Sequence, residues 1–307
     1  MHGLAIIAVL IAADSAAQSQ QPSFQTQTDL VNILVTVRDQ HNHPIATLNK
    51  SSFRVFEDGK PQEIKYFAQD SSAPLTIGVL VDSSFGQGDV LAEEREAARR
   101  FFSTAIREKD LAFLINFDTE VTLLADLTKD QATLQRSLLK LRPGRVYPDG
   151  PLAELNASRT HLYDAIFLAG EKLKEEAGHK AIVLLASGDD KGSKVKLEEA
   201  IVAAQKADAA VYSIRYAYAD SYWPNSSGLM QQTVLRKIAE GTGGRTLSPA
   251  TPESLINAVR EIAEELRSQY SIGFAPAKLD GAFHKVEVKV NQHGLRAQCR
   301  KGYFAEK

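Results

Sequence analysis

The chain has 307 residues, of which 44% are hydrophobic, and its formal net charge is −2. This length suits one large hydrophobic core or two ordinary domains. Acidic and basic residues nearly balance and no block of Lys and Arg stands out, so the composition argues against a nucleic-acid-binding groove.

The N-terminal segment has the layout of a secretory signal peptide. An apolar run over 4–13 is too short to span a bilayer, and it is followed by small residues at 15–17 and a polar run at 18–21. This pattern predicts a cleaved signal peptide over 1–17 and a disordered linker over 18–28. Because no Lys or Arg precedes the apolar run, an uncleaved anchor or a disordered tail is the alternative. We expect an exported protein, periplasmic, on the cell surface or extracellular, with no transmembrane span after cleavage.

The segment 29–73 has the periodicity of β-strands. Hydrophobic side chains occupy alternate positions from Val31 to Val37. Two short strands are predicted next, over 53–56 and 64–67. The Asp58-Gly59 pair between them is a strong turn signal. We interpret 29–73 as the first part of a β-sandwich.

From 74 to 267, short apolar runs alternate with segments of helical periodicity. Strands are expected over 75–81, 111–117, 181–186 and 209–216. Helices are expected over 89–106, 130–141, 161–177, 197–204, 229–240 and 252–267. Asp89 and Thr160 stand where a side chain would cap the first and third of these helices. Alternating strands and helices predict a doubly wound, mostly parallel sheet covered on both faces.

The segment 268–307 returns to strand alternation. It is too small to form a stable sandwich alone, as is 29–73, so we predict that the two segments pair into one Ig-like β-sandwich with the α/β domain inserted between them. The single cysteine, Cys299, excludes an internal disulfide. It alternates with Leu295 and Ala297, which predicts a buried core thiol.

Polar side chains follow several of the predicted strands of the α/β domain. Asp82 and Ser84 come directly after the first strand, Ser187 and Asp189 follow a later one, and Thr160 opens a helix at the same edge. Ligands of doubly wound sheets bind outside the carboxyl ends of the strands. Hydroxyl and carboxylate oxygens gathered there would suit Mg²⁺ or Mn²⁺. The alternative is that these residues only cap helices and form turns.

The same features resemble a von Willebrand factor A (VWA) domain. Asp-x-Ser ends the first buried strand, a Thr precedes LYDAI, and Gly-Asp-Asp follows VLL. The flanking stretches FRVFEDGKPQEIKYFAQ, QYSIGFAP, FHKVEVKV and CRKGYFA are similar to those of VWFA-related exported proteins of the Acidobacteria type. The resemblance covers nearly the whole chain after the predicted leader, and it implies a VWA fold with a partner-binding face at the strand ends.

The resemblance also implies a metal-ion-dependent adhesion site, which is degenerate here. Asp82, Ser84 and Thr160 match three of the family's five site residues. The second Ser of Asp-x-Ser-x-Ser falls on Gly86, and the later Asp falls on Ser187. Asp189, two residues further on, is a candidate substitute. With one hydroxyl and one carboxylate lost, we expect weak or absent binding of Mg²⁺ or Mn²⁺.

An aromatic loop after the strand over 209–216 is the second candidate for partner binding. Tyr218, Tyr222 and Trp223 would suit an interface, because Tyr and Trp anchor protein contacts; the alternative is that they pack on neighbouring helices. The chain lacks G-x-S-x-G, H-E-x-x-H and phosphate-loop motifs. We therefore expect a non-enzymatic module that binds an unknown protein ligand, with a structural or assembly module as the main alternative and a hydrolase as a distant third.

Overall fold

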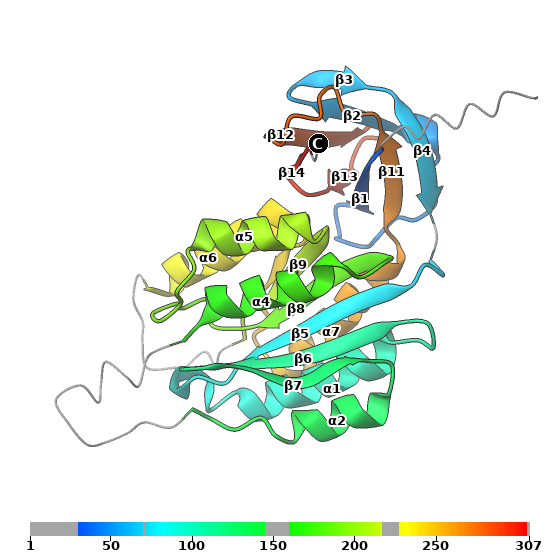
Figure 1. The fold of residues 1–307 in the computed structure, drawn as a ribbon. Helices are drawn as coiled ribbons and strands as arrows, with labels where there is room; N and C mark the ends of the chain where they lie inside the picture. The colour runs from blue at the N-terminus through cyan, green and yellow to red at the C-terminus, as the bar shows by residue number, and fades with distance from the viewer. Residues whose placement is uncertain (1–29, 70, 145–159, 217–226, 306–307) are drawn as a thin grey trace, which may run out of the picture.

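A computed structural model describes residues 30–69, 71–144, 160–216 and 227–305. They form a large α/β body and a smaller β-sandwich that sits against one end of it (Figure 1). The fold class expected from the sequence is confirmed: a mostly parallel, helix-covered sheet accompanied by antiparallel sheets. The predicted signal peptide and linker lie outside the described residues.

The α/β body is built on a six-stranded sheet with the order β10-β9-β8-β5-β6-β7. All its neighbours pair in parallel except β7, which runs antiparallel beside β6 at the edge. Strand β5 is buried along its whole length, as a parallel strand covered on both faces should be. The strands are β5 (Leu75–Asp82), β6 (Leu111–Phe117), β7 (Val121–Thr128), β8 (His179–Leu185), β9 (Ala209–Ile214) and β10 (Thr246–Leu247).

Helices cover both faces of this sheet and enclose two separate hydrophobic cores. Helices α1 (Leu91–Ala105), α2 (Gln131–Leu138) and α7 (Pro252–Arg267) cover one face. Helices α4 (Leu162–Lys174), α5 (Leu197–Lys206) and α6 (Ser227–Thr242) cover the other. The division into two layers is visible in Figure 1, where the sheet runs between the two groups of helices.

The β-sandwich joins segments from both ends of the chain around a third core. One sheet has the order β13-β1-β11-β4 and the other β14-β12-β2-β3. The first contains β1 (Val31–Arg38), β4 (Ile64–Gln69), β11 (Tyr270–Phe274) and β13 (Arg296–Gln298). The second contains β2 (Phe53–Glu57), β3 (Lys60–Gln62), β12 (Phe283–Val290) and β14 (Gly302–Phe304). Because Gln69 pairs with Tyr270, the chain leaves for the α/β body and returns from it on adjacent strands.

Three strands and the N-terminus of α1 differ from the sequence-based expectation. Strand β3 falls where the sequence predicts a turn, and it can contain Pro61 because a proline is tolerated on an edge strand. Strands β7 and β10 are the two edges of the six-stranded sheet; β7 lacks the continuous apolar run of the central strands, and β10 has only two residues. The N-cap of α1 is Val90 and carries no side-chain cap, so the expected capping role of Asp89 is wrong.

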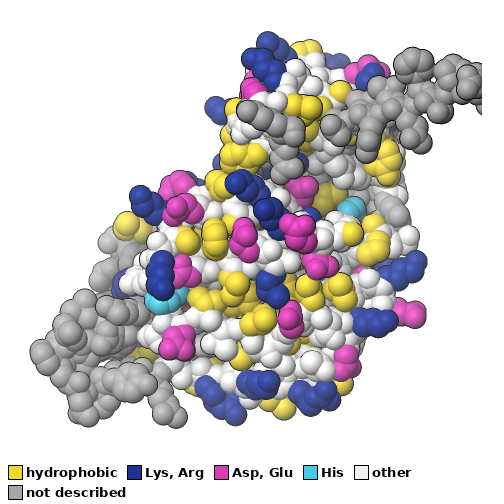
Figure 2. All heavy atoms as spheres, in the orientation of Figure 1, with side chains coloured by type: hydrophobic (Ala, Val, Ile, Leu, Met, Phe, Trp, Pro, Cys, Tyr) yellow, Lys and Arg dark blue, Asp and Glu magenta, His cyan; other side chains and the backbone are white. Residues whose placement is uncertain are grey.

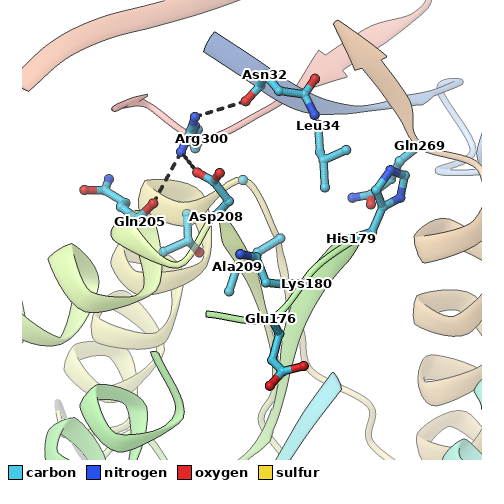
Figure 3. A pocket seen from close by; sticks show the side chains of 14 residues that line it. Asn32, Leu34, Glu176, His179, Lys180, Gln205, Asp208, Ala209, Gln269 and Arg300 are labelled. Atoms are coloured by element: carbon cyan, nitrogen blue, oxygen red, sulfur yellow. Dashed lines mark hydrogen bonds and ion pairs between the residues drawn. The ribbon is translucent and has the colours of Figure 1, made fainter. Parts of the chain in front are cut away.

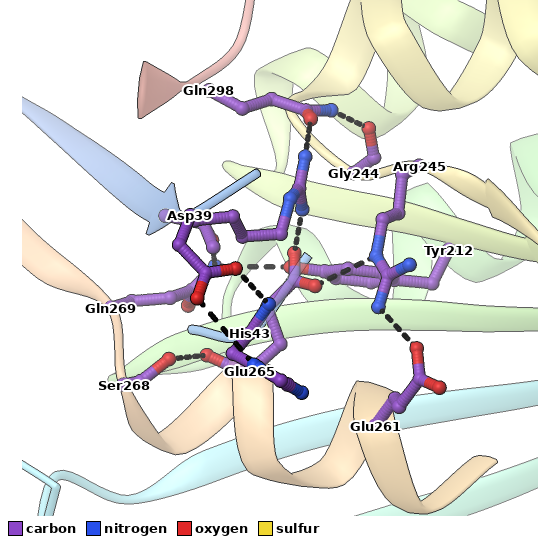
Figure 4. A network of polar contacts seen from close by, with 12 residues as sticks. Asp39, His43, Tyr212, Gly244, Arg245, Glu261, Glu265, Ser268, Gln269 and Gln298 are labelled. Carbon is purple, nitrogen blue, oxygen red and sulfur yellow. Dashed lines mark hydrogen bonds and ion pairs between the residues drawn. The ribbon is translucent and has the colours of Figure 1, made fainter. Parts of the chain in front are cut away.

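A buried ion-pair network fastens the sandwich to the α/β body (Figure 4). Glu265, on α7, is 1% exposed; its carboxylate accepts hydrogen bonds from Arg38 at 2.7 Å and from Arg245 at 2.8 Å. Arg38 also donates to Gln298, and Gln298 donates in turn to the carbonyl of Gly244. Hydrogen bonds and ion pairs therefore join strands of the sandwich to elements of the α/β body.

Candidate functional site

The carboxyl ends of β5 and β8 meet at the switch point of the sheet. These strands are neighbours, but the chain goes on from β5 to β6 on one side and from β8 to β9 on the other. Ligands of open α/β folds bind at such a switch point. The Ser187 hydroxyl donates to Asp82 Oδ2 at 3.0 Å, and the Ser84 amide donates to Asp82 Oδ1 at 3.0 Å. The structure thus brings three of the predicted site residues into direct contact.

Asp82 forms the buried centre of this cluster. Burial raises the pKa of its carboxyl, while hydrogen bonds from Ser84 and Ser187 oppose that effect. A desolvated carboxylate held only by neutral donors has a strong tendency to attract a cation or a proton.

Thr160 lies at the start of α4, and its hydroxyl is not used for capping. His161 is the N-cap, and the amide of Tyr163 instead donates to Asp190 and to Ser193, at 3.1 Å each. Thr160 is 1% exposed, and its Oγ1 has no hydrogen-bond partner in the described part of the chain. The expected N-cap role of Thr160 is wrong, and an orphaned buried hydroxyl remains at the strand ends.

The other candidate ligands contribute less. The Asp189 amide donates to Ser187 Oγ at 3.2 Å, but among the described residues no hydrogen bond joins its carboxylate to Asp82. Gly86 is exposed, and a Cβ built on it would meet nothing within 4 Å, so no neighbouring atom occupies the place of the missing serine.

These observations test the metal site that the resemblance implies. Asp82, Ser84 and Thr160 are the residues that would hold a divalent ion. Both Asp82 oxygens already accept hydrogen bonds, and Ser187 supplies a hydroxyl at the position where the implied adhesion site would have a second carboxylate. Within the described ranges, no group of three or more His, Cys, Asp and Glu side chains is placed to hold a metal. The donor set is incomplete for Mg²⁺, which requires near-octahedral oxygen coordination.

Glu94, on α1, is a buried acid near this site that sequence reasoning missed. It is 0% exposed, and neither carboxylate oxygen has a hydrogen-bond partner among the described residues. Burial raises its pKa well above the usual range, and the charges of Asp82 and Glu93 add to the effect. A signal existed, because Glu94 stands between Leu91 and Ala98 on the apolar face of the helix.

Four exposed hydrophobic side chains lie on segments that begin or end at the carboxyl edge of the sheet. Phe85 directly follows Ser84, and Leu139 follows the end of α2. Leu229 and Met230 lie in the first turn of α6. Their side chains are 58%, 63%, 72% and 71% exposed, respectively. We call these four residues the strand-end patch. Their exposure at the edge where ligands bind in this class of fold makes them candidate anchors for a partner.

Of the expected aromatic loop, the structure describes only the residue that precedes it, Tyr216. Tyr218, Tyr222 and Trp223 lie outside the described residues. Tyr216, which precedes them, is 0% exposed and packs into the core beneath α1 and α7, so it is a core residue.

A small polar cavity of about 160 Å³ lies at the other end of the sheet, where the sandwich meets the amino ends of β8 and β9 (Figure 3). Arg300 helps to close it by pairing with Asp208 and donating to the Asn32 carbonyl at 3.0 Å. Burial lowers the pKa of Lys180, on its wall. The cavity is part of the junction between the two bodies and is separate from the strand-end site.

Cys299 packs, partly buried, against the sandwich core. Burial raises the pKa of its thiol to about 12, so the thiol is protonated at neutral pH.

None of the helices in the described part of the chain has the length and hydrophobicity of a membrane span.

Comparison with solved structures defines the class of fold. The von Willebrand factor type A protein from Catenulispora acidiphila matches with a TM-score of 0.52 and 12% identity, over 92% of this chain and 65% of that one. At this identity the match shows the fold alone: the chain has the VWA fold together with its flanking sheets.

Two pilus proteins match with lower scores. The vWF domain of the type V pili tip protein Mfa5 from Porphyromonas gingivalis has a TM-score of 0.46 and 14% identity, over 62% of this chain and 94% of that one. The D319A mutant of the PilB minor pilin from Streptococcus sanguinis has a TM-score of 0.47 and 13% identity, over 64% of this chain. This chain spans 62% of that pilin's length. No protein-family model and no curated protein matches the sequence.

Proposed function

We propose that this chain is an exported, non-enzymatic VWA module that binds a protein partner through its strand-end face without depending on a metal. The observation that carries the proposal is the strand-end patch, four exposed apolar side chains on segments that begin or end at the carboxyl edge of the sheet. Phe and Met are enriched at protein interfaces, where large apolar side chains act as anchors. Export is supported by the leader-like N-terminus, and the Acidobacteria-type lineage by the flanking motifs.

The donor set supports weak or lost dependence on a metal. Ser187 contributes a proton donor to Asp82, and Gly86 contributes no side-chain ligand. The adhesion chemistry implied by the resemblance, in which an acidic group of the partner completes the coordination of a metal, therefore lacks its ion-binding half here. Apolar contact then supplies the binding free energy, at about 25 cal/mol per Å² of apolar surface buried.

The test is affinity capture from an extract of the envelope of cells that make the protein, in EDTA and in millimolar Mg²⁺. We expect Phe85→Ser combined with Leu229→Ser to lower capture of the specific partner at least tenfold, equally in both buffers. Tyr66→Ser is the matched control, because Tyr66 is 50% exposed but lies on β4 of the sandwich. Unchanged capture by the double variant, or capture only with Mg²⁺, would contradict the proposal. A hydrolytic activity that Ser84→Ala abolishes would replace it with an enzyme.

A further inference from the structure

A second concave surface lies between the sandwich and α5. It has a volume of about 720 Å³, within the usual range of roughly 300–1,000 Å³ for ligand pockets. One wall is the outer face of the sheet that contains β12 and β14, and the other is formed by α5 and the end of α6. Hydrophobic and Lys/Arg side chains lie side by side at this neck in Figure 2. We call it the neck groove.

The neck groove is lined by apolar side chains on a sheet face that faces solvent, where polar side chains are usual. Strand β12 alternates exposed and buried residues, and Phe283 is on the exposed side, with 40% of its surface accessible. Its ring meets that of Phe304 edge to face, with centroids 5.2 Å apart. Phe56, Ile201 and Val202 complete the apolar surface.

Gly302 keeps the Phe283 ring in this position. A Cβ on Gly302 would collide with the Phe283 ring and with the backbone carbonyl of His284. Because Gly302 has no side chain, the Phe283 ring can lie over this position of β14. The glycine therefore leaves room for the aromatic surface of the groove.

Three lysines and two glutamates line the groove, and one of the glutamates, Glu287, is paired with Lys289 at 3.3 Å. Glu198 pairs with Lys237 at 2.8 Å, and Lys301 pairs with Glu240 at 3.4 Å. Lys285 lines the groove and forms no ion pair with any described residue. Lys206, from α5, places its ammonium 5.5 Å from the centre of the Phe304 ring, and it too has no described carboxylate partner. Two lysines next to an apolar surface are thus left available for an anion.

We propose that the neck groove binds an amphiphilic carboxylate, an alkyl chain that carries one acidic group. The chain would lie against Phe283, Phe304 and Ile201, where it is removed from water, and the carboxylate would pair with Lys285. The charge excess selects an anion over a neutral lipid, and the apolar lining selects an alkyl chain over a small polar anion. This site is separate from the strand-end patch, so its failure would leave the proposed partner-binding function unaffected.

The experiment is isothermal titration of the mature chain with dodecanoate and with dodecanol, both below the concentration at which they aggregate. We expect dodecanoate to bind about fivefold more tightly, the difference expected of a partly exposed ion pair. Lys285→Gln should remove this preference, and Phe283→Ser should weaken both ligands. Lys65→Gln, an exposed lysine on the opposite sheet, is the control and should change neither.

Three results would overturn the proposal. The first is equal affinity of the wild type for the two ligands, and the second is binding that Phe283→Ser leaves unchanged. The third is the absence of dodecanoate binding together with binding of an acidic, apolar peptide, which would make the groove a protein-docking surface. Phe283 and Lys285 are both exposed, so their variants should fold, and a circular dichroism melt of each variant checks this.

Discussion

If the strand-end site has lost its metal as proposed, restoring the two positions that differ from the adhesion motif should create a metal-binding protein. The change is the double substitution Gly86→Ser and Ser187→Asp. A Cβ at Gly86 meets nothing within 4 Å, so a serine fits there. Ser187 already contacts Asp82 through its hydroxyl at 3.0 Å, so an aspartate at that position places a second carboxylate beside a buried one.

The magnitude follows from that distance. Two like charges about 4 Å apart repel by about 4 kcal/mol at an effective dielectric constant of 20. The metal-free double variant should therefore lose about 4 kcal/mol of unfolding free energy, a fall in melting temperature of about 8–16 °C at 2–4 °C per kcal/mol. Mg²⁺ or Mn²⁺ at a concentration of 100 times its Kd would return about 2.7 kcal/mol, because it binds only the native state.

Differential scanning calorimetry in EDTA and in millimolar Mg²⁺ or Mn²⁺ measures both effects. Gly86→Ser alone should change neither melting temperature, and adding Asp82→Ala to the double variant should abolish the response to metal. The reasoning is refuted if the double variant melts like the wild type in EDTA, since the two carboxylates would then not interact. It is also refuted if the wild type responds to metal as strongly as the double variant does.

Two further predictions concern buried carboxylates. Glu265→Gln breaks the junction network and should lower the unfolding free energy by about 3–5 kcal/mol, whereas Glu198→Gln at an exposed pair should cost less than about 1 kcal/mol; equal urea midpoints would contradict this. The raised pKa of Glu94 means that the native state keeps a proton that the unfolded chain loses above the ordinary glutamate pKa of 4.5, so native stability falls as pH rises from there toward the folded pKa. Glu94→Gln should therefore gain stability relative to wild type between pH 4 and pH 8; a constant difference in urea midpoint would show that Glu94 does not titrate this way.

Much of the architecture was predictable because it depends on local patterns. Continuous apolar runs and helical periodicity identified β5, β8 and their covering helices, and alternation identified β1 and β12. The edge strands β3 and β7 were missed because a strand that is covered on fewer sides needs less regular side-chain patterning.

The candidate site was predictable in part. The position of Asp82 and Ser84 at the end of a buried strand follows from the rule for doubly wound sheets, and Ser187 does reach Asp82. The capping of α4 was not predictable, because the Tyr163 amide is bonded by Asp190 and Ser193, which come from a loop about 30 residues later in the chain.

The sequence alone determined the helices, the central strands, the polar residues at the strand ends and the differences at Gly86 and Ser187 from the adhesion motif that it resembles. The tertiary structure decided which of these groups are desolvated and paired. It buried Glu94 and the Thr160 hydroxyl without hydrogen-bond partners among the described residues, and it brought Phe283 and Phe304 beside α5 to form the neck groove. The physical reason is range: periodicity arises from neighbours along one element, whereas burial and charge pairing depend on elements far apart in the chain.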